Sequence, residues 1–436
     1  MSRVRRVLAI GSIAAAVIFL ATIIVGSVYS MQPSQLVMET ARVVVTPVLR
    51  WWYRDDLDYV AKTTAQYKIP APGEPRGTAL ESWQKLQGEL PGLVVTTVRN
   101  PPDTAADVPF VYEQPDLEYL KQLREKYHLD ALIADAPDEY HAMLKVAEWL
   151  GTRWDHGADK LVGTSQVCDP VAIIEAGQQG AKYWCEIASR TMVHVASSLS
   201  WPSRLITASR DGYTWEHALA EVWSDQFGKW FVIDADFNVI YESAGVPLSA
   251  LELSRDGPRL QRSGKLTVRQ FAPPKKSLPL QDMVPYYRYV HIDMRNDWCT
   301  RTLKRGSPAG GDLSTWWTAR PDMPRLLTAR RRVDDPALFD WPVNSVSLYA
   351  VKGQATSAGL AIQVALAGYS PEFARFELNV DGGAWEPVQG QVRELQLGYG
   401  AHSIEARVVT ESGGDGPPAR VELQVSPPAA GIRGPG

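Results

Sequence analysis

The stretch CEIASRTMVHVASSL, residues 185–199, and the three short apolar segments after it decide the fold of this chain. The stretch itself predicts a helix that begins at Cys185. The segments that follow predict β-strands, over Arg204–Ala208, His217–Trp223 and Trp230–Ile233. A helix that leads into successive short strands predicts an α+β domain, with helices packed on an antiparallel sheet.

Three side chains in this region are of the types that thiol catalysis requires. Cys185 opens the predicted helix, His217 begins a predicted strand, and Asp234 closes another. A thiolate nucleophile needs an imidazole as its ion-pair partner and proton carrier, and a carboxylate that fixes the tautomer of the imidazole. A helix N-terminus beside a protonated histidine also favours the thiolate. We therefore expect a Cys185-His217-Asp234 triad, with Asp236, on the same strand face, as the alternative carboxylate.

The residues around the triad resemble the transglutaminase-like superfamily over roughly residues 115–250. The blocks that carry the resemblance are EWLGTRWDHG (148–157), YWCEIASR (183–190), WPSR (201–204), EHALAEVW (216–223) and GKWFVID (228–234). The resemblance implies a papain-like core in which Cys185 is the nucleophile, His217 the base and Asp234 the orienting carboxylate. It also implies that the backbone N–H of Cys185 is one donor to the oxyanion. Trp184 and Gln166 are the candidate substrate-binding residues.

The chain departs from the pattern of that superfamily at three positions. Tyr183 stands where glycine is common, Leu219 where tryptophan is common, and Ala235 where proline is common. These differences leave the triad intact and bear on substrate preference. Since the superfamily includes cross-linking acyltransferases, peptidases, glycoprotein amidases and inactive members, the resemblance does not choose among these activities.

The N-terminus predicts a single membrane span. Residues 7–29 carry no charge, and as a helix they span roughly 34 Å, enough for a hydrocarbon core of about 30 Å. Arginines at positions 3, 5 and 6 predict that residues 1–6 form a cytoplasmic tail and that the bulk of the chain is extracytoplasmic. A cleaved signal peptide is the alternative, but the apolar run exceeds the usual h-region of about 7–15 residues.

The remaining boundaries follow from changes in composition and periodicity. Residues 30–110, with two loops rich in proline, predict a juxtamembrane stalk, and residues 111–264 hold the transglutaminase-like domain. Residues 265–343 form an extension of uncertain fold. Residues 344–427 alternate with period two around an Asp381-Gly382 turn, which predicts a β-sandwich of the immunoglobulin or fibronectin type. Residues 428–436 predict a flexible tail.

Composition excludes several other classes of protein. The 436 residues carry a net charge of −4, which argues against a nucleic-acid-binding protein. Three cysteines do not make a disulfide-stapled fold, and no spacing of cysteine, histidine or carboxylate residues predicts a metal site or another cofactor. Cys168 and Cys299 are expected to be buried thiols or a disulfide with each other, which leaves Cys185 free.

Together these features predict a membrane-anchored, extracytoplasmic thiol enzyme of the cell envelope. The expected substrates are proteins, peptides or glycan-linked amides, cleaved or transferred through a thioester, and hydrolysis by a peptidase or amidase is favoured over acyl transfer. The β-sandwich is expected to meet surface-polymer or envelope partners. The alternative is a non-catalytic binding or scaffold protein of a cell-surface polymer system.

Overall fold

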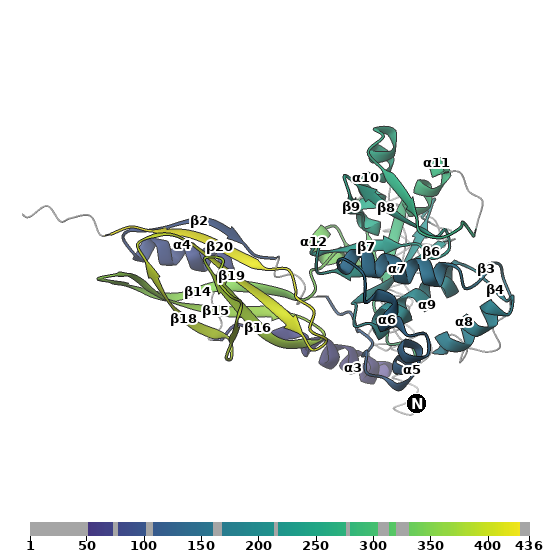
Figure 1. Ribbon diagram of the computed structural model, residues 1–436, viewed down its shortest axis with the longest axis horizontal. Coiled ribbons are helices and arrows are strands. Elements are labelled where there is room, and N and C mark those ends of the chain that lie inside the picture. The colour runs from purple at the N-terminus through teal and green to yellow at the C-terminus, as the bar shows by residue number, and fades with distance from the viewer. Residues whose placement is uncertain are drawn as a thin grey trace, which may run out of the picture.

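The computed structural model describes residues 51–72, 77–101, 108–159, 168–212, 217–275, 280–303, 314–319 and 331–427. Helices and strands are mixed and fall into two lobes (Figure 1), which confirms the prediction of an α+β protein. The predicted membrane span at residues 7–29 lies outside the described residues, as does the predicted tail at 428–436. Among the residues that are described, none of the helices has both the length and the apolar character needed to cross a membrane.

The first lobe is built on a six-stranded sheet with the order β13-β12-β11-β5-β6-β7. Neighbouring strands are antiparallel, except that β12 and β13 are parallel. The strands are β5 (Ser203–Ser209), β6 (His217–Ser224), β7 (Lys229–Ile233), β11 (Tyr289–Asp293), β12 (Ser314–Trp317) and β13 (Arg331–Val333).

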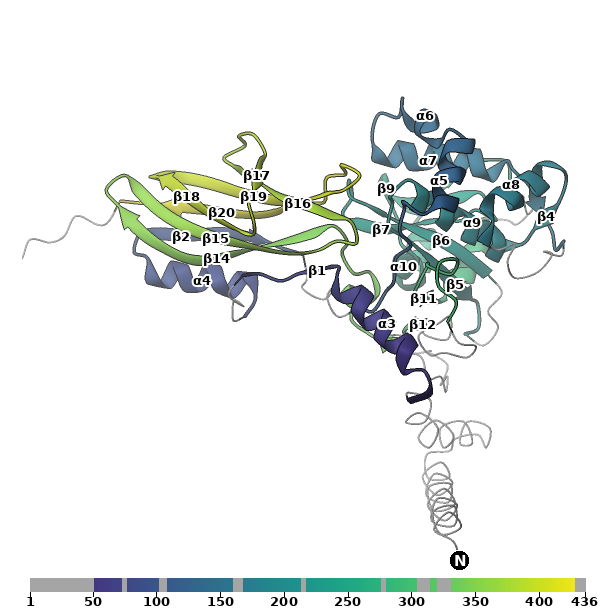
Figure 2. The same ribbon diagram turned by 90° about the horizontal axis from the view of Figure 1, so that it is seen from below.

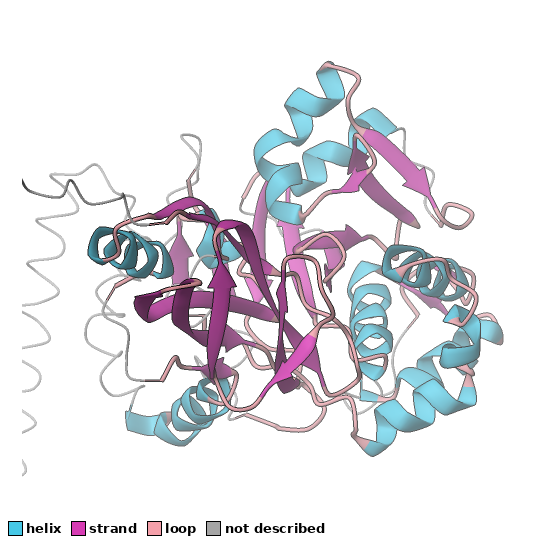
Figure 3. Cartoon of the chain, turned by 60° about the vertical axis from the view of Figure 1, so that its left-hand side comes forward, coloured by secondary structure: helices cyan, strands magenta, loops and turns pink. Residues whose placement is uncertain are grey.

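Helices surround this sheet, as Figure 3 shows. They are α5 (Glu118–Lys126), α6 (Leu129–Ile133), α7 (Glu139–Gly151), α8 (Pro170–Gln178), α9 (Cys185–Ser198), α10 (Ala250–Arg262), α11 (Leu280–Met283), the 3-10 helix η3 (Val284–Tyr287) and α12 (Pro336–Phe339). Short strands complete the lobe: β3 (Asp155–His156) with β4 (Lys182–Tyr183), and β8 (Val239–Ser243) between β9 (Val246–Pro247) and β10 (Thr267–Gln270).

The central strands β6 and β7 are buried on both faces. Leu219 and Trp230 belong to one apolar cluster, which includes leucines of α10, whereas Ala220 and Phe231 belong to a second, which includes residues of α7 and α9. This division follows from the period of two in a strand, which sends successive side chains to opposite faces. The site residues at the ends of these strands therefore rest on a rigid support.

The extension at 265–343, which has no evident fold in the sequence, contributes three strands to this sheet. Strand β11 pairs with β5 on one side and with β12 on the other. Its five residues are all buried. The run Tyr286–Ile292 is rich in aromatic and β-branched residues, which is typical of a strand, but a strand buried on both faces shows no alternation that would indicate its neighbours in the sheet.

The second lobe consists of two sheets that share one apolar core. One sheet joins β1 (Lys68–Ile69), β15 (Gly359–Tyr369), β14 (Ser345–Thr356) and β18 (Val392–Gly398). The other has the order β17 (Glu386–Val388), β16 (Phe373–Val380), β19 (Gly400–Thr410), β20 (Ala419–Val425) and β2 (Leu93–Arg99).

The prediction of a stalk over residues 30–110 is wrong for its C-terminal half. Strand β2 forms an antiparallel pair with β20, and α4 (Ala79–Glu89) lies against β14 (Figure 2). Trp83 of α4 is fully buried and donates a hydrogen bond from Nε1 to the carbonyl of Leu348 at 2.8 Å. The pairing of β2 shifts register between Val95 and Thr97, so its alternation is interrupted. Helix α3 (Arg54–Ala65) precedes this region.

A buried arginine connects two strands of the central sheet to Asp340, the residue after α12. Arg204 of β5 is fully buried and donates to Glu221 of β6 at 2.7 Å and to Asp340 at 2.6 Å. Its guanidinium also lies 4.2 Å from the centre of the Trp230 ring. Removing one member of such a network leaves buried charges without compensation.

We predict that R204A lowers the free energy of unfolding by about 3–5 kcal/mol, because Glu221 and Asp340 lose their cationic partner. R393A is the matched control, since Arg393 pairs with Glu386 at 2.8 Å on the surface, and it should cost at most about 1 kcal/mol. Urea unfolding of both variants measures the difference. Equal losses in the two variants would contradict the importance of the buried network.

Candidate active site at the start of helix α9

Helix α9 places Cys185 at its first position. The preceding residue, Trp184, has an extended backbone and provides no side-chain cap, so the chain enters the helix directly at the cysteine. The first amides of a helix have no intrahelical acceptor, and the positive end of the helix dipole lies there. Cys185 is a free thiol and is partly exposed. The sulfur of Cys185 therefore belongs to the residue at the positive end of the helix dipole and is partly open to solvent.

The imidazole of His217 is held by a carboxylate. His217 begins β6 and is 1% exposed, and its Nε2 lies 2.6 Å from Oδ2 of Asp234. The ring of Phe237 stacks on the imidazole at 4.6 Å between centroids, and Tyr286 meets it edge-on at 5.6 Å. Nδ1 of His217 is buried and has no nitrogen or oxygen partner within the described ranges. The imidazole is therefore fixed in orientation, with Nδ1 as its unused nitrogen.

Asp234 directly follows β7 and is fully buried. Its Oδ2 accepts a hydrogen bond from the hydroxyl of Tyr287 at 2.5 Å, and its Oδ1 accepts from the backbone N–H groups of Asp236 at 3.1 Å and Phe237 at 3.0 Å. Burial raises the pKa of Asp234, but the charge of His217 and these hydrogen bonds outweigh burial and lower it below its ordinary value. Asp234 is therefore held as a carboxylate.

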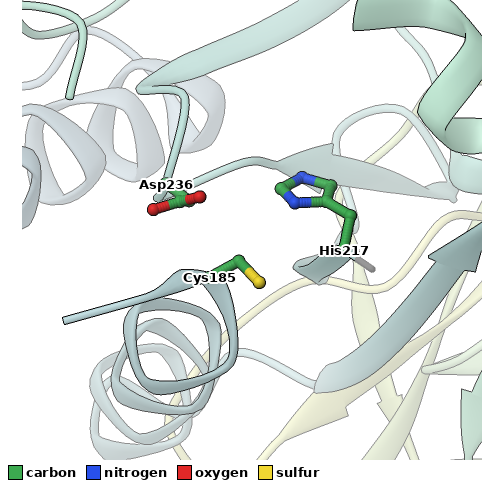
Figure 4. A group of neighbouring side chains, drawn as sticks. All are labelled: Cys185, His217 and Asp236. Carbon is green, nitrogen blue, oxygen red and sulfur yellow. The ribbon is translucent and has the colours of Figure 1, made fainter. Parts of the chain in front are cut away.

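The thiol and the imidazole meet at the end of the sheet (Figure 4). Sγ of Cys185, a ring nitrogen of His217 and a carboxylate oxygen of Asp236 all lie within 4.8 Å of one another. Burial lowers the pKa of His217, but the charge of Asp234, its hydrogen bond and the neighbouring Cys185 raise it to about 10. The protonated imidazole is thus the favoured form beside Cys185 at neutral pH, as a thiolate–imidazolium pair requires.

The two neighbouring aspartates have different partners. Asp234 bonds the imidazole of His217, so the structure favours it over Asp236 as the orienting carboxylate. Asp236 instead accepts from Nδ1 of His156 at 2.7 Å and lies on the side of the imidazole that faces the thiol. Asp234 and Asp236 are expected on the same face of one strand because they are two residues apart. Instead, a turn follows Asp234 and separates the two carboxylates.

Two other groups at the site have no distinctive sequence pattern. Tyr287 comes from η3, 53 residues after Asp234. Lys275 donates from Nζ to the carbonyl of Ala235 at 2.9 Å and lies 4.5 Å from the centre of the Trp154 ring. Burial lowers the pKa of Lys275 to about 8, although the nearby carboxylates of Asp236 and Asp234 oppose that change. The only signal for Lys275 in the sequence is a basic residue in a loop, which is not specific.

Neither predicted substrate-binding residue is tested by the structure. Trp184 precedes Cys185 in the chain and is 38% exposed, and its role stays a prediction. Gln166 lies outside the described residues, and its role as a substrate-binding amide stays a prediction. Cys168 and Cys299 form a disulfide with a Cα–Cα distance of 5.2 Å, one of the two alternatives expected for them. Of the three cysteines, Cys185 is the free one.

Comparison with known proteins does not assign a family or a function to this chain. No protein-family model matches the chain, and no match is found among curated proteins. The function is therefore argued from the arrangement of the side chains.

We predict that Cys185 reacts with iodoacetamide at pH 6 faster than an ordinary thiol, of which less than about 1% is thiolate at that pH. D234N should slow this reaction at least about tenfold, because the amide no longer stabilises the imidazolium of His217. Intact-mass spectrometry measures the rate at the one free cysteine. D381N is the matched control, since Asp381 bonds His402 at 2.7 Å in the other lobe. A wild-type rate that follows an ordinary thiol would refute the ion pair.

We also predict that the contribution of His217 to stability falls as pH rises. Its pKa in the folded protein is about 10, against an ordinary value of 6.5, so the folded state binds the extra proton between these values. The contribution is therefore complete below about pH 6.5 and is lost as pH approaches 10. The difference in unfolding free energy between the wild type and H217Q should shrink from pH 6 to pH 9.5. A difference that grows over this range would contradict the assignment.

Proposed function

We propose that this protein is a cysteine hydrolase of the transglutaminase-like superfamily that cleaves amide bonds through a Cys185-His217-Asp234 triad. The observation that carries the proposal is the 2.6 Å contact between Nε2 of His217 and Asp234. This contact commits Nε2 as the donor and leaves Nδ1 to exchange a proton with the thiol. Two further features support the proposal: the thiol is free and partly exposed, and it begins a helix.

The first half of the reaction forms a thioester. The Cys185 thiolate attacks the amide carbonyl carbon, and the carbonyl oxygen becomes an oxyanion that the backbone N–H of Cys185 is placed to stabilise. The C–N bond then breaks, and the imidazolium of His217 gives its Nδ1 proton to the departing amine. The products of this half are the acylated cysteine, a free amine and a neutral His217.

The second half of the reaction releases the acyl group. Neutral His217 takes a proton from water through Nδ1, and the resulting hydroxide attacks the thioester carbonyl. The C–S bond breaks, which yields a carboxylic acid and restores the thiolate beside an imidazolium. An amine in place of water would give acyl transfer by the same steps. We favour hydrolysis, because the sequence has no segment that resembles a regulated acyl-acceptor channel or a calcium site.

The proposal extends to fold family and location. We infer that the first lobe has a papain-like core and that the two facing sheets of the second lobe are of the immunoglobulin or fibronectin type. The uncharged run at residues 7–29 after three arginines supports a single membrane anchor with the bulk of the chain extracytoplasmic. Proteins, peptides and glycan-linked amides of the envelope are then the accessible substrates, and the second lobe is available to surface-polymer partners.

The test is a screen of peptide and amide substrates with the full chain. C185S should lower kcat by about 10³-fold or more on any substrate that the wild type cleaves, because the nucleophile is lost. The wild type should also accumulate a thioester that intact-mass spectrometry detects.

H402Q is the matched control and should retain the wild-type rate, since His402 lies on β19 of the other lobe. Hydrolysis by C185S at the wild-type rate would refute the proposed function. A wild type that never acylates, despite a reactive thiol, would favour the scaffold alternative.

A further inference from the structure

Three donor atoms of different chemistry converge at the proposed active site. Sγ of Cys185, a ring nitrogen of His217 and a carboxylate oxygen of Asp236 lie within 4.8 Å of one another (Figure 4). They come from the start of α9, the start of β6 and the turn after β7. Thiolate, imidazole and carboxylate are the three ligand types that Zn²⁺ takes in proteins.

His217 can coordinate a cation through Nδ1. Its Nε2 is engaged by Asp234 at 2.6 Å, which is the outer-sphere carboxylate that metal-binding histidines commonly have. Nδ1 belongs to a side chain that is 1% exposed, and it has no nitrogen or oxygen partner in the described part of the chain. A buried nitrogen of this kind gains a bond when a cation enters.

The carboxylate is held in a similar way. His156 lies 2.7 Å from Oδ1 of Asp236 through its Nδ1, and the Asp236 side chain is fully buried. A thiolate and a carboxylate together carry two negative charges, which a divalent cation neutralises. Lys275 lies close enough to Asp236 for their charges to interact, but its Nζ donates to the carbonyl of Ala235.

The dimensions suit a small cation after slight side-chain movement. Tetrahedral Zn²⁺ with bonds of about 2.0–2.3 Å sets its ligand atoms roughly 3.3–3.6 Å apart. The present separations, at most 4.8 Å, exceed this spacing by no more than about 1.5 Å. Cys185 is partly exposed, so a fourth position is open to water or another solvent ligand.

We propose that Cys185, His217 and Asp236 form a Zn²⁺ site that competes with the thiol chemistry. A bound ion takes the thiolate electron pair and, after the Nδ1 proton of the imidazolium is released to solvent, the Nδ1 lone pair, so neither group is available for attack or proton transfer. Zn²⁺ would therefore act as a reversible inhibitor. This regulatory consequence rests on the proposed function, whereas the binding itself does not.

The test measures Zn²⁺ binding to the full chain by competition with a chromophoric chelator. The wild type should bind one equivalent, and D236N should bind at least about tenfold more weakly, since it loses one anionic ligand. D381N, which alters a similar histidine–aspartate contact on the other lobe, should match the wild type. No binding by the wild type, several weak equivalents, or equal affinity in D236N would each overturn the proposal.

C185S gives a second, conservative test that does not depend on the folding of D236N. Co²⁺ in place of Zn²⁺ should produce a thiolate-to-metal absorption band in the wild type and in D381N, but not in C185S. A band that persists in C185S would overturn the assignment of Cys185.

Inhibition is measured separately from binding. Zn²⁺ should slow alkylation of Cys185 by iodoacetamide, and EDTA should restore the rate. If no amide substrate is ever cleaved, the proposed hydrolase fails while specific Zn²⁺ binding stands. If hydrolysis requires Cys185 but the wild type does not bind Zn²⁺, the metal site alone fails.

Discussion

The buried contact between His217 and Asp234 fixes the geometry of the candidate active site. Both side chains are withdrawn from water, so each needs the other to compensate its charge. Because the contact uses Nε2, it turns Nδ1 toward the side of Cys185 and Asp236. Tyr287 and two backbone amides satisfy the remaining acceptors of Asp234, which keeps the carboxylate ionised. The orientation of the imidazole beside Cys185 thus depends on an interaction that does not involve the sulfur.

The fold maintains this contact by burying the strands that carry it. Strands β6 and β7 are adjacent and antiparallel, and each is covered on both faces by apolar clusters. Tyr287 belongs to η3, which follows β8, α10 and β10 in the chain. The hydroxyl of Tyr241 on β8 lies 2.7 Å from the hydroxyl of Tyr287, so this segment also orients the donor to Asp234. The segment between β7 and η3 therefore supports the site.

The sequence predicts those parts of the candidate site that depend on the local pattern of apolar residues and on residue type. The start of α9 at Cys185 and the strands that carry His217 and precede Asp234 follow from apolar segments and their order. Tertiary pairing has no such signal: β2 joins β20 across more than 300 residues, and the residues of β11 do not indicate that it lies between β5 and β12. Asp234 and Asp236 have the same residue type at neighbouring positions, so only the turn after β7 distinguishes their partners.

The position of Asp236 connects the proposed thiol chemistry with the proposed cation site. A carboxylate close to a thiolate is repelled by it, and the repulsion is stronger where water is excluded. A thiolate at Cys185 would therefore need positive charge beside it, and His217 lies within 4.8 Å of both Cys185 and Asp236. A divalent cation satisfies the same electrostatic demand with two charges and direct bonds. The groups that would pair with a thiolate at Cys185 are also those that would bind the proposed metal ion, and at that site a proton and the metal compete for Nδ1 of His217.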